Sequence, residues 1–395
     1  MHIKSEIAPS EKLVKLPKYI FAELDDWKEE ARAKGADLID LGIGNPDGPT
    51  PAPIVEAAVK SIQNPKNHGY PSFKGKPEFR QAISEWMLRR YNVEVDPETE
   101  IQTLIGAKEG LAHFAMALTD PGDINIVPDP YYPVHSRGTW ISNGEIYHLK
   151  LEAKNKFLPD LSSIPEDVAK RAKVFFVNYP NNPTAAIAPK EFYRELVDYC
   201  TKYNILLCAD LAYGEICFEG YRPPSILEIE GAREVAIEFH SFSKTFNMAG
   251  WRVGFAVGNK EYIKFLYSMK TNIDYGTSSI VQDAAIEALR MPQSYVDDIA
   301  KKYGRRMEFM TEGFNKLGWN LTKPVATMYL WMQVPQGYDS KSWCRMVMDK
   351  TGVVFTPGVA FGAMSDNYFR VSLVAPDERL KEALIRLENA NIRFN

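Results

Sequence analysis

The chain has 395 residues, a length that predicts about two to three domains. Its composition, 45% hydrophobic and 25% charged, is that of an ordinary globular protein. Because 47 Lys and Arg residues stand against 51 Asp and Glu residues, the net charge of −4 argues against a basic surface for nucleic acids or anionic membranes.

The cysteines and the N-terminal segment restrict the possible classes further. The four cysteines form no C-x-x-C pair, so we expect neither a zinc ribbon nor any other bound metal. The first fifteen residues contain no apolar stretch of the secretory type, and no apolar run approaches the roughly 18 residues of a membrane span. We therefore expect a cytoplasmic protein without a membrane or nucleic-acid partner.

Short apolar runs alternate with longer helical patterns through the first 290 residues, which predicts an α/β fold with a largely parallel sheet. Most of these runs are apolar on both faces, as in strands covered by helices on each side. Helices are expected over 51–63 and 189–203, each opened by a proline. The six candidate strands cover residues 101–105, 124–128, 173–178, 205–209, 234–240 and 252–258.

The pattern changes after these strands. A long charged helix is expected over 294–318, followed by short apolar segments and two further helices. We predict a large domain over 46–290 and a smaller α+β domain over 291–395. The N-terminal arm, 1–45, is expected to join the smaller domain in part.

Unusual residues follow the predicted strands, at the sheet edge where open α/β folds bind their ligands. A small-residue turn at 106–110 opens a helix, and free N–H groups at a helix start suit a phosphate. The turn at 129–133 offers aromatic side chains, and the loop at 179–184 offers amides. Considered singly, each of these is more often an ordinary turn.

Two of the later strands are followed by charged side chains. Asp210 and Tyr213 follow the strand predicted over 205–209, and Ser241 and Lys244 follow the strand predicted over 234–240. Arg252 comes a few residues later, at the start of the strand predicted over 252–258. Taken alone, Asp210 is as compatible with a helix cap as with a ligand site, and most lysines are merely solvated. Together, however, an amine, a carboxylate, phenol and amide groups and a phosphate cradle form the set that a pyridoxal phosphate site requires.

Two motifs in this set are highly specific: Ser241-x-Ser-Lys244-x-x-Asn-x-x-Gly-Trp-Arg252, and the ordered series Asn182-Pro-Thr, Asp210-x-x-Tyr213, Lys244. With them the chain resembles the class I/II aminotransferases, pyridoxal phosphate enzymes of fold type I, from about Leu16 to the last predicted helix. The resemblance implies a large domain with a mostly parallel seven-stranded sheet and a smaller α+β domain. It also implies transamination between an L-amino acid and a 2-oxo acid.

The resemblance assigns roles to the residues that match the family motifs. Lys244 would form the Schiff base with pyridoxal phosphate and later move the substrate proton. Asp210 would keep the pyridine nitrogen protonated, and Asn182 and Tyr213 would hydrogen-bond the ring oxygen. Tyr132 would stack on the ring. Lys244, Asp210 and Tyr213 are thus the expected catalytic residues.

The same resemblance implies a phosphate site and a homodimer with shared active sites, because one phosphate contact, Tyr70, would come from the partner subunit. The other expected contacts on this side of the cofactor are Ala107, Lys108, Ser241, Ser243 and Arg252.

For the substrate, Arg370 matches the arginine whose planar fork holds the α-carboxylate by two parallel bonds. The backbone N–H of Gly44 would contact the same carboxylate. Lys108 would either face a distal carboxylate of the substrate or remain a solvated lysine. The remaining substrate-binding candidates are Tyr19, Tyr132 and Asn182.

Ala185 stands where the family usually has glycine in Asn-Pro-Thr-Gly. With the segments GAKEGLAH, DLAY and NIDYGTSS, this makes the chain similar to bacterial glutamate–pyruvate (alanine) aminotransferases. The LL-diaminopimelate aminotransferases are near relatives, but they carry an asparagine where this chain has Tyr275. We therefore expect alanine/pyruvate with glutamate/2-oxoglutarate. The alternatives are aspartate or LL-diaminopimelate as substrate, or a pyridoxal phosphate-dependent β-lyase with the same lysine and carboxylate clamp.

Two other classes fit poorly. Gly42-x-Gly44 suggests a dinucleotide-binding loop, but the next glycine is Gly48 and Pro46 interrupts the required helix start. A cofactor-binding regulator of transcription would need a basic module, and no stretch of the sequence supplies one.

Overall fold

The computed structural model describes residues 8–16 and 19–394. Residues 1–7, part of the segment in which we expect no secretory signal, lie outside the described residues. Among the described helices, none combines the length and the apolar character needed to cross a membrane.

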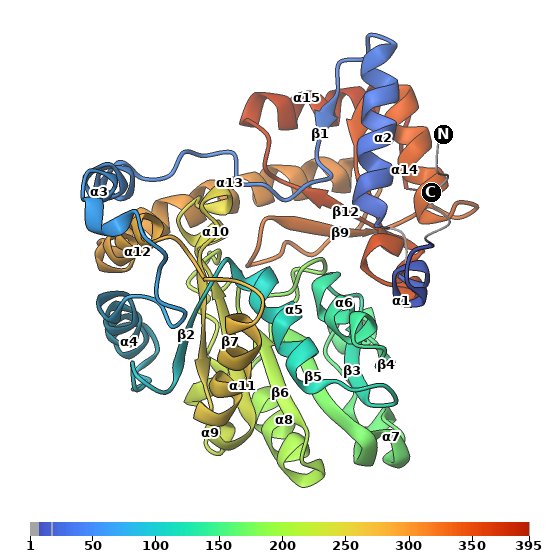
Figure 1. Ribbon diagram of the computed structural model, residues 1–395. Coiled ribbons are helices and arrows are strands. Elements are labelled where there is room, and N and C mark those ends of the chain that lie inside the picture. Colours follow the sequence, from blue (N-terminus) through green and yellow to red (C-terminus); the bar gives the residue numbers. More distant parts are fainter. Residues whose placement is uncertain (1–7, 17–18, 395) are drawn as a thin grey trace, which may run out of the picture.

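A seven-stranded sheet forms the centre of the larger part of the molecule (Figure 1). Its strand order is β2-β8-β7-β6-β5-β3-β4, and β8 runs antiparallel to both of its neighbours while all other pairs are parallel. The predicted α/β fold with a mostly parallel seven-stranded sheet is confirmed. The strands are β2 (Ile101–Leu104), β3 (Ile124–Asp129), β4 (Glu145–Lys150), β5 (Ala172–Asn178), β6 (Leu206–Asp210), β7 (Ala236–Ser241) and β8 (Gly254–Gly258).

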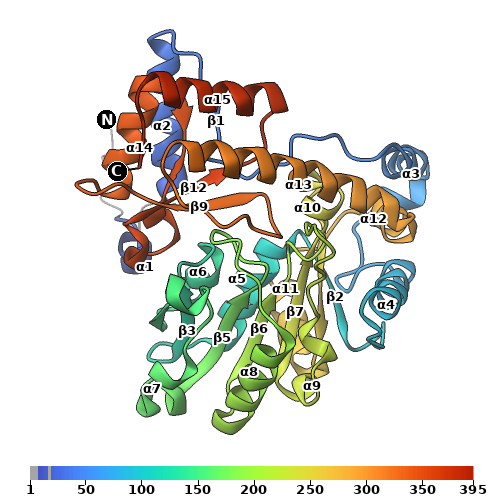
Figure 2. The same ribbon diagram turned by 180° about the vertical axis from the view of Figure 1, so that it is seen from behind.

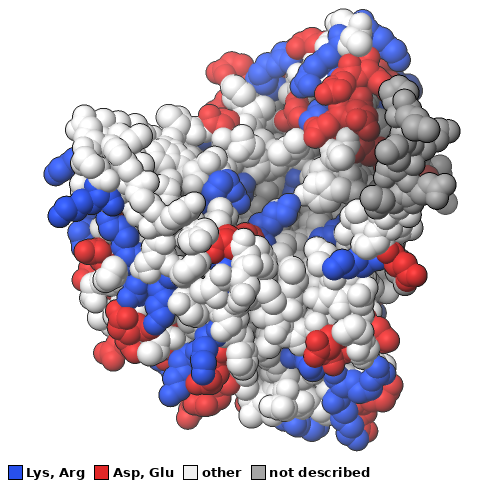
Figure 3. Space-filling view, viewed as in Figure 1, with Lys and Arg blue, Asp and Glu red and all other residues white. Residues whose placement is uncertain are grey.

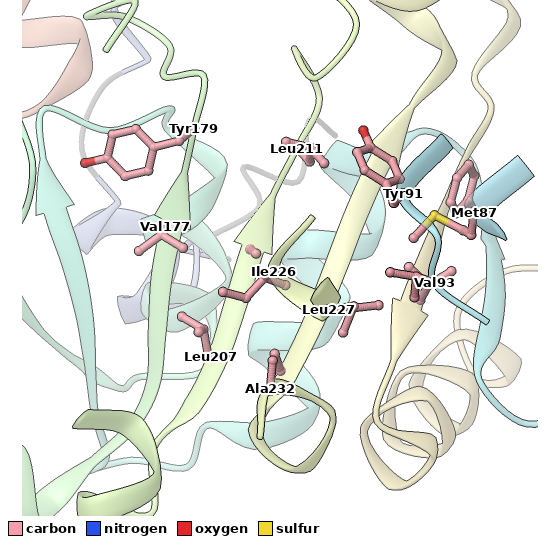
Figure 4. Close-up of a cluster of buried hydrophobic side chains, with 14 of the residues drawn as sticks. Met87, Tyr91, Val93, Val177, Tyr179, Leu207, Leu211, Ile226, Leu227 and Ala232 are labelled. Atoms are coloured by element: carbon pink, nitrogen blue, oxygen red, sulfur yellow. The ribbon is translucent and has the colours of Figure 1, made fainter. Parts of the chain in front are cut away.

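Helices cover both faces of this sheet because its central strands are apolar on both sides. On β5, Val174 and Phe176 belong to one apolar cluster, whereas Phe175 and Val177 belong to another. This alternation is the two-residue period of a strand. Part of the second cluster is drawn in Figure 4, where side chains of β5 and β6 meet those of the covering segments.

The helices divide between these two clusters. Three contribute to the cluster that contains Val174: α5 (Ala107–Leu118), α6 (Val134–Ile141) and α11 (Lys260–Thr271). Those on the other face are α3 (Ala52–Ile62), α4 (Pro77–Tyr91), α7 (Glu166–Arg171), α8 (Lys190–Tyr203), α9 (Ala232–Val235) and α12 (Ser279–Arg290). Proline caps the N-termini of α3 and α8, as expected from the sequence.

The smaller part of the molecule joins both ends of the chain (Figure 2). Its strands β9 (Tyr329–Gln333), β12 (Tyr368–Ser372) and β11 (Thr356–Pro357) form an antiparallel sheet, while β1 (Ile39–Asp40) pairs in parallel with β10 (Val353–Val354). The N-terminal segment therefore takes part in the C-terminal unit, and the boundaries near residues 46 and 290 stay predictions. The helices here are α1 (Glu11–Lys15), α2 (Ile20–Ala33), α13 (Gln293–Lys316), α14 (Ser340–Thr351) and α15 (Asp377–Asn389).

The sequence pattern differs from the structure at three strands. The strand predicted from residue 252 begins at Gly254, because Arg252 adopts a left-handed φ of +55°. The edge strand β4 was not among the six candidates, because only Leu149 of its side chains is buried and the strand carries no apolar run. The strand predicted from residue 234 begins at Ala236, since the preceding residues form α9 after Gly231, whose φ is +80°. Glycine adopts this left-handed conformation without steric cost.

Candidate active site

A cavity of about 400 Å³ lies between the carboxyl ends of the sheet strands and the smaller part of the molecule. Figure 3 shows a hollow on this face with Lys and Arg side chains inside it. The structure places thirteen of the fourteen site residues expected from the sequence around this cavity. They are Tyr19, Gly44, Ala107, Lys108, Tyr132, Asn182, Asp210, Tyr213, Ser241, Ser243, Lys244, Arg252 and Arg370.

Lys244 lies in the short helix α10 (Phe242–Thr245), directly after β7. Its Nζ donates a hydrogen bond to the carbonyl of Gly44. Burial lowers the pKa of the Lys244 ammonium to about 7, and the nearby charges of Arg370 and Arg252 act in the same direction. A large fraction of this amine is therefore neutral near pH 7, the form that attacks a carbonyl group.

Asp210 ends β6, and only 5% of its surface is exposed. Its Oδ2 lies 2.9 Å from Nε2 of His135, and the backbone N–H of Ala212 donates to Oδ1 over 3.0 Å. Asn178 supports the same turn by donating from Nδ2 to the carbonyl of Asp210 at 2.8 Å. The carboxylate is thus fixed on the cavity wall by partners that leave it accessible to a ligand.

His135 and Tyr329 are site residues that the sequence analysis missed. His135 lies in the first turn of α6, three residues after Tyr132, and the two ring centroids are 6.1 Å apart. Its place beside the aromatic turn at 129–133 was the available signal in the sequence. Tyr329 begins β9, and its hydroxyl lies 2.7 Å from the hydroxyl of Tyr213. Burial holds the pKa of Tyr213 well above its usual range, so this phenol remains protonated at neutral pH.

The start of α5 forms one wall of the cavity together with Ser241 and Arg252. Gly106 precedes this helix with a φ of +81°, and a Cβ there would come within 2.6 Å of the Arg252 guanidinium. Glycine at this point therefore lets the arginine approach the helix start. Free N–H groups of Ala107 and Lys108, a hydroxyl and a guanidinium together make a cradle for a phosphate group.

Arg370 projects from β12 and is 2% exposed. Its Nη1 donates to Oδ1 of Asn182 over 2.8 Å, and its Nη2 donates to the carbonyl of Gly42 over 2.6 Å. The guanidinium lies 4.2 Å from the ring centroid of Tyr329 and 4.7 Å from that of Phe361. Its Nε, although buried, has no partner among the described residues. A fixed guanidinium with a spare donor suits a carboxylate ligand.

These groups fit pyridoxal phosphate. The cavity is lined by an amine whose pKa is lowered to about 7, by a phosphate cradle and by a buried carboxylate that could pair with a protonated ring nitrogen.

Tyr70 is the one expected site residue that the structure leaves outside the cavity. Its side chain is 84% exposed, and its ring stacks on Tyr275 with centroids 4.4 Å apart. Phe73 stacks on the same tyrosine at 5.1 Å. Neither Tyr275 nor Ala185, the two positions that guided the substrate prediction, lines the cavity of its own chain.

The fold and the site define a pyridoxal phosphate-dependent aminotransferase. A model of the family "Aminotransferase class I and II" matches residues 36–387, and the chain belongs to this family. The family uses pyridoxal phosphate as cofactor and acts on amino acids and 2-oxo acids.

Several individual proteins are similar to this chain over nearly its whole length. The chain is similar to the LL-diaminopimelate aminotransferase of Aquifex aeolicus, with 51% identity over 97% of this chain and 99% of that protein. It is 50% identical to the enzyme of the same name from Desulforudis audaxviator, over 94% and 95% of the two chains. Among solved structures, BacF from Bacillus subtilis matches with a TM-score of 0.94 and 37% identity over 99% of each chain.

These relatives overturn the substrate predicted from the sequence. The expectation of alanine/pyruvate transamination, and of alanine aminotransferases as the nearest relatives, is wrong, because the curated relatives of high identity are LL-diaminopimelate aminotransferases. The prediction relied in part on Ala185, which adopts a φ of +58° in a buried loop and contacts no cavity space. This side chain therefore has no direct contact with the space that the substrate would occupy.

Proposed function

We propose that the chain is an LL-diaminopimelate aminotransferase, which transfers an amino group between LL-diaminopimelate and a 2-oxo acid. The observation that carries the proposal is the 51% identity to an enzyme of that name over 97% of the chain. The cavity supports it, because Arg370 on one side and Lys108 on another suit a substrate with a carboxylate at each end.

Pyridoxal phosphate supplies the electron sink that stabilises negative charge on the substrate Cα. In this proposal Lys244 would hold the cofactor through Nζ, and the same amine would later move the proton from the substrate Cα. Asp210, held by His135, would keep a proton on the ring nitrogen. Tyr213 and Asn182 would donate hydrogen bonds to the ring oxygen.

The remaining predicted residues bind the two ends of the reactants. The α5 start, Ser241, Ser243 and Arg252 would hold the phosphate, with Tyr132 against the ring face. Arg370 and the N–H of Gly44 would orient the α-carboxylate. Lys108, whose Nζ lies 3.4 Å from the Tyr19 hydroxyl and 5.2 Å from its ring centroid, would meet the distal carboxylate.

The proposal includes a homodimer in which Tyr70 reaches the cofactor of the other subunit. Its support is the exposure of apolar side chains: Tyr275, which stacks on Tyr70, is 52% exposed, and Val59 and Ile62 of α3 are 54% and 55% exposed. Figure 3 shows few charged side chains on this side of the molecule, over α3. Monomeric proteins rarely expose apolar patches of this kind.

We also propose a cytoplasmic location and the division at residues 46 and 290. All four cysteines are free, which fits a reducing compartment. Separate apolar clusters occupy the two parts of the chain, which fits two domains.

The test is the visible absorption of the purified protein during separate additions of LL-diaminopimelate, glutamate, aspartate and alanine. We expect the yellow colour of the lysine-bound cofactor to be lost with LL-diaminopimelate and turnover to follow when a 2-oxo acid is added. Lys244→Ala should abolish turnover. Bleaching by aspartate or alanine but not by LL-diaminopimelate would refute the substrate, and a Lys244→Ala variant with full activity would refute the mechanism.

A further inference from the structure

One charged side chain of the cavity, that of Asp25, has no role in the proposal so far. Six charged residues line the cavity among the described part of the chain. Three of them are placed on the cofactor, Arg370 on the α-carboxylate and Lys108 on the distal carboxylate. The sixth is Asp25, to which the sequence analysis gave no function.

Asp25 lies in the first half of α2, four residues after Phe21. Residues at this spacing share one face of a helix, and both line the cavity. The ring of Phe21 lies 5.8 Å from the Arg370 guanidinium. Asp25 thus lies one helical turn from Phe21 and lines the cavity, and because its side chain is 57% exposed it belongs to the part of the lining that is open to solvent, here called the mouth. Figure 3 shows acidic side chains over α2 next to the hollow.

The charges around Asp25 leave a negative excess at this point. Its Oδ1 lies 2.6 Å from Nζ of Lys28, and the same ammonium lies 2.9 Å from Oδ2 of Asp40. One buried ammonium thus serves two carboxylates. Oδ2 of Asp25 accepts no hydrogen bond from the part of the chain that the structure describes. A cationic ligand at the mouth would supply the missing charge.

LL-diaminopimelate carries such a cation, because its distal end is a second amino-acid head with one ammonium and one carboxylate. We propose that Asp25 accepts the distal ammonium of the substrate, next to the distal carboxylate held by Lys108. This inference rests on the proposed function and adds the residue that would recognise the group by which LL-diaminopimelate differs from a simple dicarboxylic amino acid. An ammonium brought to this mouth without a partner would lose water without compensation.

The test compares two substrates on one variant. L-2-Aminopimelate has the same length and the same two carboxylates but lacks the distal ammonium. For Asp25→Asn holoenzyme, we expect kcat/KM for LL-diaminopimelate to fall about 10- to 100-fold, the usual effect of a hydrogen bond between charged groups. The value for L-2-aminopimelate should stay within about twofold, because Asp25 has no partner group on that substrate.

Two variants serve as controls. Asp26→Asn makes the same change of charge on the same helix, at a residue that does not line the cavity. The value of kcat/KM should therefore be unchanged for both substrates. Asp25→Glu keeps the charge and should retain most of the preference for LL-diaminopimelate. Because Asp25 is solvent-exposed and Lys28 keeps Asp40, the Asn variant should fold and bind the cofactor as the wild type does.

The outcomes separate the two proposals. The role of Asp25 is refuted, and the proposed function stands, if the wild-type enzyme uses LL-diaminopimelate but Asp25→Asn changes kcat/KM equally for both substrates. The same holds if the variant changes kcat/KM for neither substrate. The same role is refuted if Asp26→Asn matches the effect of Asp25→Asn. If the wild-type enzyme does not transaminate LL-diaminopimelate, the proposed function fails and the inference fails with it.

Discussion

Asp129 should make the stability of the folded enzyme depend on pH near pH 6. The residue ends β3 and is 1% exposed. Its Oδ1 accepts a hydrogen bond from Oγ of Ser365 at 2.8 Å, and its Oδ2 accepts one from the backbone N–H of Met364 at 3.3 Å. No Lys, Arg or His of the described residues forms an ion pair with it. Burial therefore dominates and raises the pKa of Asp129 to about 6.

The direction and size of the effect follow from this pKa. In the unfolded chain the carboxyl group titrates near 3.8, so between about pH 4 and pH 6 the folded protein binds more protons than the unfolded one. Stability therefore falls as pH rises through this window. A difference of about two pKa units corresponds to about 3 kcal/mol. With an unfolding entropy of about 2.1 cal/mol/K per residue, the whole window amounts to about 4 °C in transition temperature for a chain of this length. The part above pH 5 covers about one pKa unit and amounts to about 2 °C.

The assay is thermal unfolding of the wild-type and Asp129→Asn holoenzymes between pH 5 and pH 8. The Asn side chain does not titrate, so the transition temperature of the variant minus that of the wild type should increase as pH rises through 6. Ser365→Ala removes a donor to the carboxylate and should move the midpoint of this change to higher pH. A difference that is the same at pH 5 and pH 8 would show that Asp129 does not titrate in this range.

Three further substitutions test other parts of the structure. Arg370→Lys replaces a planar guanidinium by a single ammonium, so KM for the amino acid should rise about 10- to 100-fold with a smaller change in kcat. Steady-state kinetics measures both values, and an unchanged KM would contradict the proposed role in binding the carboxylate. Tyr329→Phe removes the hydroxyl 2.7 Å from that of Tyr213 and should lower kcat/KM about tenfold, whereas wild-type kinetics would show that this bond does not support the site. Lys270, 1% exposed and 2.7 Å from Oε1 of Glu109, compensates two carboxylates, so Lys270→Met should cost about 3–5 kcal/mol in urea unfolding of the holoenzyme. A loss below about 1 kcal/mol would mean that these carboxylates reach water or become protonated.

The fold could be predicted where a strand is buried on both faces. The residues of β5 are apolar at successive positions because both faces meet helices, and this leaves a continuous run that is visible in the sequence. An edge strand does not need apolar residues on both faces, because helices do not cover it on both sides. The strand β4 is exposed at both ends and half-buried over Ile146–His148, with no continuous buried run, so its existence depends on pairing with β3 rather than on its own pattern.

The site was predictable where a functional side chain directly follows a strand. Asp210 and Lys244 were found because the strand end fixes their position within a few residues, and the family motifs surround them. Tyr329 and Asp25 enter the cavity from a strand and a helix outside the central sheet. Asp25 is one of several acids on α2, and only the packing of that helix against the cavity distinguishes it from its neighbours.

The substrate prediction failed for a related reason. Ala185 and Tyr275 differ visibly from the family pattern, but neither side chain lines the cavity of its own chain. A departure from a family motif does not by itself indicate a different substrate. Whether it changes specificity depends on where the side chain points, and the sequence does not contain that information for a loop.

The order of the site residues along the chain has a consequence for protein synthesis. The groups proposed for the cofactor within one subunit lie between Ala107 and Arg252, and the central sheet is complete at Gly258 with β8. Arg370 leaves the ribosome much later, although its partners Gly42 and Asn182 are already made. A nascent chain therefore carries every group proposed for the cofactor within its own subunit before it carries the arginine proposed for the substrate carboxylate. In the proposed function, the lysine of the growing polypeptide would meet its cofactor before β12 could hold a substrate.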